Sequence, residues 1–139
     1  MQKNVISKIA EEHFKIRQLM KTVLESSNNH DKSWAFIVLK HEIIEHMAGE
    51  EQSIYLHTGN LNLDRTYDHH DIKECLQRLN LIKIDDPNWD EAFKSFCQVV
   101  ENHCGDEEEN LFHAINNYFD TDLLITMEKE YNLGRLLSF

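Results

Sequence analysis

Two stretches of this sequence decide its fold: HMAGEEQSIY at residues 46–55 and HCGDEEENLF at residues 103–112. In each stretch a histidine is followed four residues later by a run of glutamates, two in the first stretch and three in the second. Residues four apart lie on one face of an α-helix, so His46 pairs with Glu50 and His103 pairs with Glu107. The repeat therefore predicts two helices that present the same polar pair to a shared interior.

A second repeat precedes each of these stretches and extends the match over most of the chain. His13, with Ile16 three residues later, comes before the first stretch, and His69, with Ile72, comes before the second. The two halves thus contribute the same donors in the same order. A helical bundle can bring such halves together about a pseudo-two-fold axis.

Apolar residues recur at steps of three and four along most of the chain, which is typical of amphipathic helices. The expected helices are 5–23, 31–56, 64–79, 87–119 and 122–133, with N-caps at Asp64, Asp86 and Asp120 and a stop at Gly134. One proline and four glycines in 139 residues also favour long helices. We predict one all-α domain, 1–139: an antiparallel up-down-up-down four-helix bundle over about 3–119, with a short C-terminal helix over about 121–134 as an appendage.

Charge and cysteine content limit the partners and the compartment. The net charge of −11 at pH 7 repels phosphate backbones, so we expect no nucleic-acid partner. The N-terminus lacks the apolar segment of a signal peptide, and the longest apolar run, residues 34–39, is too short to cross a bilayer. Three cysteines indicate reduced thiols rather than a disulfide framework. We expect a soluble cytoplasmic protein, monomeric or homodimeric, with no membrane contact.

Six residues of the repeats fall on the core-facing stripes of the expected helices and are our candidate metal ligands: His13, His46, Glu50, His69, His103 and Glu107. A lone histidine on such a stripe is usually a packed core residue, and a lone His-x-x-x-Glu is usually a surface pair. Six at matched core positions need another explanation, because buried ionisable groups are costly unless they pair with one another or with a cation. Two imidazoles and one carboxylate from each half suit non-heme iron, with manganese and zinc as alternatives.

The joint pattern resembles the hemerythrin-like family of HHE cation-binding domains. Its carriers are EEHFKI at 11–16, HMAGEEQSIY at 46–55, DHHDIKECL at 68–76 and HCGDEEENLF at 103–112. The resemblance implies a four-helix bundle around two iron ions with a bridging oxo or hydroxo group. By position it implies that His13 and His46 bind one iron and that His69 and His103 bind the other. Glu50 and Glu107 would bridge the two.

One departure from the family affects the expected function. Oxygen-carrying hemerythrins have a further histidine four residues after the third-helix ligand, where this chain has Lys73. About one coordination position would then stay open on each metal, which favours reactivity or metal exchange over clean reversible oxygen carriage.

Two classes of function are consistent with such a centre, and we expect a small gaseous or peroxide ligand as the partner at the metal site. The first is a protein without catalytic residues that binds dioxygen or nitric oxide, or that senses or buffers iron. The alternative is a di-iron oxidoreductase acting on peroxide or nitrogen oxides, or a stress protein that repairs iron–sulfur clusters.

Residues beside the candidate ligands leave alternatives open. His70 adjoins His69 and could take its place, although helical periodicity favours His69. Glu42 lies one turn before His46. It could accept a hydrogen bond from a ligand imidazole, serve as an extra ligand, or simply be exposed. Glu51 and Glu108 come directly after the bridging pair, and we expect them to be solvated or to contact a ligand rather than a metal.

Two glycines, Gly49 and Gly105, interrupt helices beside the ligands, at a cost of about 1 kcal/mol each. Close helix packing explains them better than room for a small ligand. Cys104 follows a candidate ligand and points away from it, which predicts a structural role.

Overall fold

The computed structural model describes residues 4–58 and 66–138, and those ranges contain helices and no strand. The helices in chain order are α1 (Val5–Glu25), α2 (Asn29–Glu51), α3 (Ile54–His57), α4 (Thr66–Asn80), α5 (Pro87–Asp106), the π-helical segment η2 (Glu107–Leu111), α6 (Phe112–Tyr118) and α7 (Thr121–Leu136). The predicted all-α class is confirmed. Within the same ranges, no helix is long and apolar enough to cross a membrane.

Side-chain caps explain where several helices begin. Side-chain oxygens of Asn4, Asn28, Asp86 and Asp120 accept hydrogen bonds from backbone N–H groups in the first turns of α1, α2, α5 and α7. Pro87 follows its cap at a position where a missing N–H costs no helical bond. The predicted caps at Asp86 and Asp120 are confirmed, whereas the predicted cap at Asp64 lies outside the described residues.

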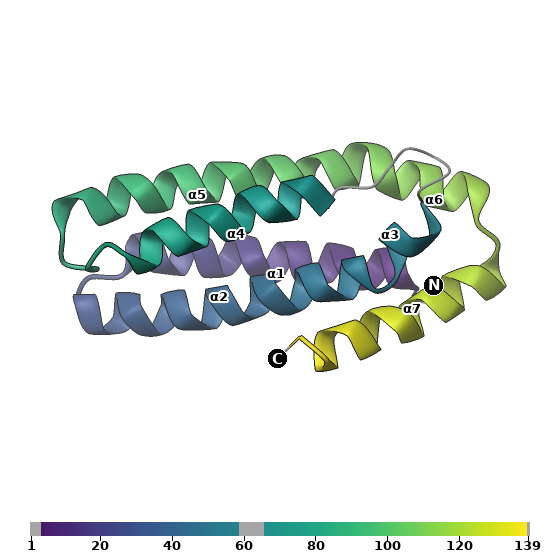
Figure 1. The fold of residues 1–139 in the computed structure, drawn as a ribbon, viewed down its shortest axis with the longest axis horizontal. Coiled ribbons are helices and arrows are strands. Elements are labelled where there is room, and N and C mark those ends of the chain that lie inside the picture. Colours follow the sequence, from purple (N-terminus) through teal and green to yellow (C-terminus); the bar gives the residue numbers. More distant parts are fainter. Residues whose placement is uncertain (1–3, 59–65, 139) are drawn as a thin grey trace.

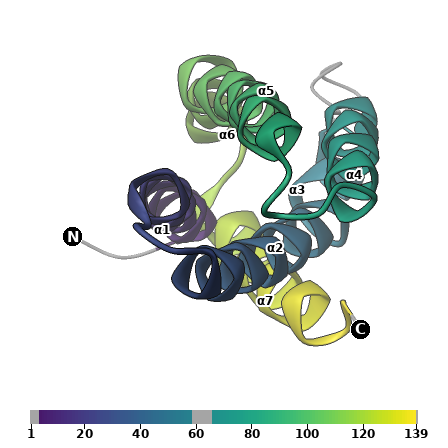
Figure 2. The same cartoon turned by 90° about the vertical axis from the view of Figure 1, so that its left-hand side faces the viewer.

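Four long helices, α1, α2, α4 and α5, form an antiparallel bundle, and α6 continues the line of α5 (Figure 1). Viewed from its end, the bundle has the four helices around a common axis, with α1 against α2 and α4 against α5 (Figure 2). Consecutive helices run in opposite directions, as predicted. The N-terminal halves of α1 and α4 therefore lie at the same end of the bundle as the C-terminal halves of α2 and α5.

The bundle core has two apolar clusters with a polar layer between them. The larger cluster includes Ile16, Ile43 and Val100, and the smaller includes Ile9 and Leu111. On α1, His13 falls between Ile9 of the smaller cluster and Ile16 of the larger. The polar layer is therefore covered by apolar side chains on both sides along the bundle axis.

The predicted C-terminal helix is present as α7, but it is not an appendage. It continues through Gly134 to Leu136 and packs along the outside of α2 (Figures 1 and 2). A Cβ at residue 134 would lie 2.7 Å from the backbone oxygen of Ala48, so only glycine lets the two helices approach this closely. The predicted helix stop at Gly134 is wrong, because this glycine serves packing and not termination.

Two of the predicted helices are irregular beside the candidate ligands. The second, expected to reach Leu56, ends at Glu51, and the chain starts a new helical turn, α3, at Ile54. The fourth passes through η2, where the N–H of Phe112 bonds to the carbonyl of Glu107, five residues earlier. The first break comes just after Glu50 and Glu51, and the π-helical segment begins at Glu107, so each irregular segment adjoins a candidate bridging glutamate.

Candidate metal centre

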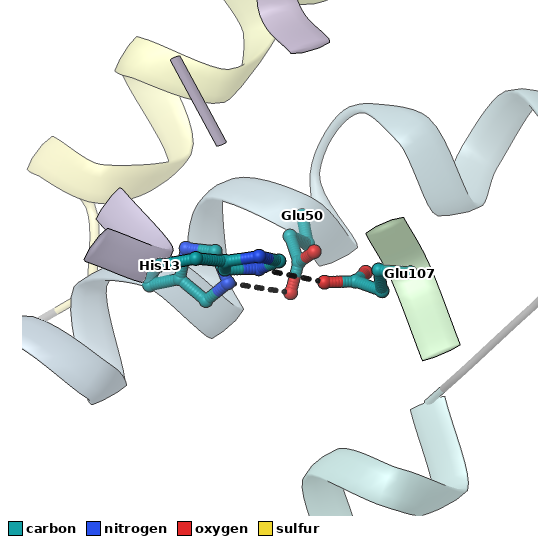
Figure 3. A group of neighbouring side chains, drawn as sticks. His13, Glu50 and Glu107 are labelled. Carbon is teal, nitrogen blue, oxygen red and sulfur yellow. Dashed lines mark hydrogen bonds and ion pairs between the residues drawn. The ribbon is translucent and has the colours of Figure 1, made fainter. Parts of the chain in front are cut away.

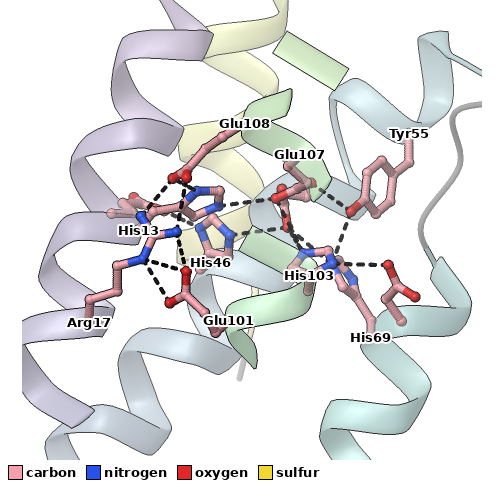
Figure 4. Close-up of polar contacts among 12 residues, drawn as sticks. His13, Arg17, His46, Tyr55, His69, Glu101, His103, Glu107 and Glu108 are labelled. Carbon is pink, nitrogen blue, oxygen red and sulfur yellow. Dashed lines mark hydrogen bonds and ion pairs between the residues drawn. The ribbon is translucent and has the colours of Figure 1, made fainter. Parts of the chain in front are cut away.

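The six candidate ligands come together in the buried polar layer; Figure 3 labels Glu50 and Figure 4 labels the other five. Each is at most 3% exposed: His13 on α1, His46 and Glu50 on α2, His69 on α4, His103 on α5 and Glu107 in η2. The alternating helix directions explain this meeting. Histidines near the starts of α1 and α4 lie level with the His-x-x-x-Glu pairs near the ends of α2 and α5.

On the α1–α2 side, each imidazole directs Nε2 to a central glutamate. Nε2 of His13 lies 3.1 Å from Oε1 of Glu107. Nε2 of His46 lies 3.2 Å from Oε1 of Glu50, the residue one turn later on the same helix. The predicted i, i+4 geometry of this pair is therefore present.

On the α4–α5 side, two more imidazoles approach the same carboxylates. Nε2 of His69 lies 3.0 Å from Oε1 of Glu50, and Nε2 of His103 lies 3.3 Å from that atom. Nε2 of His103 is also 3.3 Å from Oε1 of Glu107. Glu50 thus stands between the two pairs of histidines.

Atoms suited to metal binding form two overlapping groups. One group contains His13, His46, Glu50 and Glu107. Figure 3 shows the side chains of His13, Glu50 and Glu107 converging. The other contains Glu50, His69 and His103. In each group the donor atoms lie within 4.8 Å of one another. Because Glu50 belongs to both, the site has the donors for two adjacent cations that share a carboxylate.

The second nitrogen of every imidazole faces a carboxylate outside the central pair. Nδ1 lies 2.9 Å from Glu108 in His13, 2.8 Å from Glu12 in His46, 3.6 Å from Glu51 in His69 and 3.3 Å from Asp68 in His103. The contact of His69 is too long for a hydrogen bond, and the other three are hydrogen bonds. An acceptor at Nδ1 holds the proton there and leaves the Nε2 lone pair for a metal.

Two buried atoms in the middle of the site make no hydrogen bond to any described residue. They are Nε2 of His46 and Oε2 of Glu50. Buried polar atoms are almost always hydrogen-bonded, because an unpaired one costs about 1–3 kcal/mol. Imidazole nitrogen and carboxylate oxygen are both ligand atoms that iron accepts. The residues present therefore fit a metal pair.

Protons on the histidines balance the carboxylates when no metal is bound. Burial lowers the pKa of His46, but the adjacent carboxylates of Glu50 and Glu12 outweigh it and raise that pKa to about 10. Burial raises the pKa of Glu50, whereas the nearby His46 imidazole holds it well below its usual range. Burial also lowers the pKa of His69 and His103, and neighbouring carboxylates again raise it by more. An incoming metal ion must displace these protons.

Tyr55 and Phe112, at matching positions of the two repeats, make the two sides chemically different. The Tyr55 hydroxyl donates a hydrogen bond of 2.9 Å to Oε2 of Glu107 and lies 3.2 Å from Nε2 of His69. Phe112 stacks on the ring of His13, with 5.9 Å between the ring centroids. The α4–α5 side therefore has a hydroxyl group where the α1–α2 side has an apolar ring.

Arginines hold the outer carboxylates on the α1–α2 side. The guanidinium of Arg17 lies 2.8 Å from Oε2 of Glu108. Figure 4 shows these two side chains beside His13. The guanidinium of Arg135, on α7, lies 2.8 Å from Oε2 of Glu12. Burial raises the pKa of Glu108 and of Glu12. The hydrogen bonds of Glu108 with Arg17 and of Glu12 with His46 lower it by more, so both stay charged acceptors.

The structure decides between the alternatives left open for His70 and Glu42. The side chain of His70 is 73% exposed and lies 3.7 Å from Glu74, so His69 is the one that reaches the site. Glu42 is buried rather than exposed, and it pairs with Arg135 at 3.3 Å and with a lysine of α1. It is not the acceptor for His46, because Glu12 takes that place.

Three other charged residues lie at the edge of the site. Glu51 and Glu108 face imidazoles and not the centre of the site, as expected. Lys73, in place of the family's further histidine, is half exposed and lies 3.8 Å from Glu51.

Close packing explains one of the two glycines but not the other, and Cys104 is buried as a structural residue would be. A Cβ on Gly49 would lie 2.9 Å from the ring of Tyr131, so close packing is confirmed there. A Cβ on Gly105 would meet no atom within 4 Å, so close packing is wrong for that residue. Cys104 is buried in the larger apolar cluster.

The outer carboxylates include residues that we did not predict from sequence, although the repeat contained a signal for them. Glu12 and Asp68 each precede the first histidine of their half of the chain. Each accepts from the histidine of the other helix in that half, Glu12 from His46 and Asp68 from His103. The internal repeat thus extends to the partners of the ligands.

The fold has a counterpart among known structures, although no protein-family model and no curated protein matches the chain. A crystal structure of a hemerythrin HHE cation-binding domain-containing protein from Mycobacterium kansasii matches with a TM-score of 0.85. The match covers 99% of this chain and 88% of that chain, at 19% sequence identity. The chain therefore has the hemerythrin-like helical bundle that the sequence resemblance implied.

Proposed function

We propose that this protein binds two metal ions, iron in the cell, in the polar layer of its bundle. His13 and His46 would hold one ion, and His69 and His103 would hold the other. Glu50 and Glu107 would bridge the two ions. The observation that carries the proposal is the orientation of the imidazoles, which turn Nε2 to the central carboxylates and Nδ1 to outer ones. The description of the Mycobacterium kansasii protein as cation-binding also supports it.

Iron is the metal that this donor set suits best. Two imidazoles and a carboxylate for each ion are typical of non-heme iron, while manganese and zinc accept the same donors. Bound iron would supply open coordination positions for a small ligand. We propose that the protein binds dioxygen or nitric oxide there, or senses or buffers iron, in the cytoplasm and as a monomer or homodimer.

Metal analysis of protein purified without added metal tests the proposal. We expect two iron ions per chain and an oxygen-dependent absorption band that reverses under vacuum. His46→Ala and His103→Ala should each lose metal, while His70→Ala, at the exposed neighbour of a proposed ligand, should keep both ions. Less than about one metal per chain, with no further loss in His46→Ala or His103→Ala, would refute the proposal.

The position of Tyr55 favours a second candidate function, turnover of peroxide. Burial and the two central glutamates raise the pKa of Tyr55, so its hydroxyl stays protonated beside Glu107 and His69. A protonated donor at this place can assist the chemistry of a di-iron oxidoreductase. Metal-loaded protein supplied with an added reductant should then reduce hydrogen peroxide to water, and Tyr55→Phe should slow this reaction by about 100-fold at equal metal content. Protein that does not consume peroxide would exclude this second function.

A further inference from the structure

The side chains that restrain the ligands are closer on one side of the proposed metal centre than on the other. The inference drawn from this for metal binding rests on the proposed function. The α1–α2 side brings four donor residues within 4.8 Å of one another, and the α4–α5 side brings three. The Nδ1 contacts are 2.8 and 2.9 Å on the first side, against 3.3 and 3.6 Å on the second. The repeat is therefore symmetric in residue types and unequal in geometry.

Helix α7 supplies much of the restraint on the α1–α2 side. The hydroxyl of Tyr131, which is fully buried, donates a hydrogen bond to Oε1 of Glu12 and lies 2.8 Å from Nδ1 of His46. One turn later, Arg135 lies 2.8 Å from Oε2 of the same glutamate. Glu12 thus contacts α7 through a hydrogen bond at Oε1 and an ion pair at Oε2, so it cannot turn away from His46 without losing contacts to α7.

Helix α7, whose side chains keep Glu12 in place, is itself packed against α2 on both sides of His46. Before His46, Arg135 contacts Glu45 at 2.7 Å and the buried Glu42, one turn earlier, at 3.3 Å. After His46, the ring of Tyr131 packs so closely on Gly49 that a Cβ there would lie 2.9 Å from it. The position of α7 and the position of the imidazole are therefore set by the same contacts.

We propose that Tyr131 and Arg135 are positioning residues of the metal centre, which act through Glu12 and make the His13–His46 side the first to bind metal and the last to release it. A carboxylate held on Nδ1 orients the imidazole and increases its basicity toward the metal, and loss of such a partner typically costs about 10–100-fold in affinity. The His69–His103 side, with its longer contacts, fills second. Occupancy of that second side is then the step that responds to the supply of iron.

Anaerobic titration of the metal-free full-length chain with Fe(II), measured by calorimetry, tests the inference. We expect two separate steps. Crystals loaded with one equivalent should place the anomalous signal of iron between His13 and His46. Tyr131→Phe keeps the ring and removes only the hydroxyl, so it should weaken the first step by about 10–100-fold and leave the second nearly unchanged.

Two matched variants separate a positioning role from a general loss of structure. Asp68→Asn changes the Nδ1 acceptor of His103, so it should weaken the second step and leave the first. Tyr118→Phe makes the same chemical change as Tyr131→Phe at a side chain that is 70% exposed, and it should change neither step. If Tyr131→Phe does not fold, Arg135→Gln provides the same test, with a smaller loss expected in the first step.

The outcomes distinguish the inference from the proposed function. Two equal steps, or a first ion between His69 and His103, would overturn the inference and leave the metal pair intact. An unchanged first step in a folded Tyr131→Phe or Arg135→Gln variant would overturn it as well. A wild-type chain that binds no Fe(II) would refute the proposed function itself.

Discussion

Glu107 and Glu108 are neighbours in the chain, yet they contact opposite nitrogens of one imidazole. Oε1 of Glu107 lies 3.1 Å from Nε2 of His13, and Oε2 of Glu108 lies 2.9 Å from its Nδ1. Neighbours in a regular α-helix point about 100° apart, which separates their side chains. Both glutamates lie in η2, where bonds to the fifth residue put more residues into each turn and bring neighbouring side chains closer in direction. The π-helical turn therefore lets one helix contact both nitrogens of His13.

Replacing Glu108 tests the outer half of this contact. Glu108→Ala leaves Nδ1 of His13 without its acceptor, so we expect Fe(II) affinity on the α1–α2 side to fall by about 10–100-fold. Glu109→Ala removes the same charge from the next residue, which is exposed, and it should leave the affinity unchanged. Equal losses in the two variants would show that net charge, and not the contact with His13, is responsible. Calorimetric titration of metal-free protein measures both.

A second prediction concerns the number of metal ions that depend on each residue. Oε1 of Glu50 lies within 3.3 Å of Nε2 in three of the histidines, so Glu50→Ala should reduce iron binding on both sides. His69→Ala should remove one ion and spare the other, because this imidazole belongs to one donor group only. Elemental analysis of protein loaded with excess Fe(II) gives the count. Two ions retained by Glu50→Ala would mean that it does not bridge them.

The candidate ligands could be predicted from sequence because their geometry is local. A spacing of four places His46 and Glu50 on one helix face whatever surrounds them, and the repeat in the second half shows that the pattern is not accidental. The bundle could be predicted from the same periodicity. The partners at Nδ1 needed one more step, since Glu12 and Asp68 serve a histidine on another helix.

The contribution of α7 could not be predicted in this way, since it depends on how helices pack. Nothing local to Tyr131 or Arg135 indicates that they reach Glu12, which is more than a hundred residues earlier. The sequence contains a weak signal for the π-helical turn, because successive buried residues at positions 103, 107, 111 and 115 are spaced four apart. Four residues exceed a turn of 3.6, so these positions would drift around a regular helix by about 40° at each step. A wider turn removes part of that drift.

The metal-free protein should lose stability as the pH rises above neutrality. In the folded chain the pKa of His46 is about 10, against 6.5 without the fold, because the carboxylates of Glu50 and Glu12 outweigh the effect of burial. A raised pKa means that the folded chain binds this proton more tightly than the unfolded chain does. Its contribution is therefore complete below about pH 6.5 and disappears as the pH approaches about 10. His69 and His103 act in the same direction.

Thermal unfolding between pH 6 and pH 10 checks this prediction with and without metal. The unfolding temperature of the metal-free protein should fall across the window. The metal-loaded protein should not show this fall, because metal binding requires neutral imidazoles and becomes stronger as the pH rises. In His46→Ala the fall should be smaller than in the wild-type chain. A metal-free protein whose unfolding temperature rises or stays level would contradict the assigned charge balance.

Two glycines on different helices, Gly49 and Gly105, should respond to alanine in opposite directions. In Gly49→Ala the new Cβ would lie 2.9 Å from the ring of Tyr131, and such overpacking costs about 1–3 kcal/mol, more than the gain of up to about 1 kcal/mol in helix propensity. In Gly105→Ala the Cβ meets no atom within 4 Å, so only that gain remains and the protein should be more stable by about 0.5–1 kcal/mol. Denaturant unfolding of the metal-free variants measures both changes. If Gly49→Ala were as stabilising as Gly105→Ala, the ring of Tyr131 would not rest on α2, and α7 would not be held where it keeps Glu12 against His46.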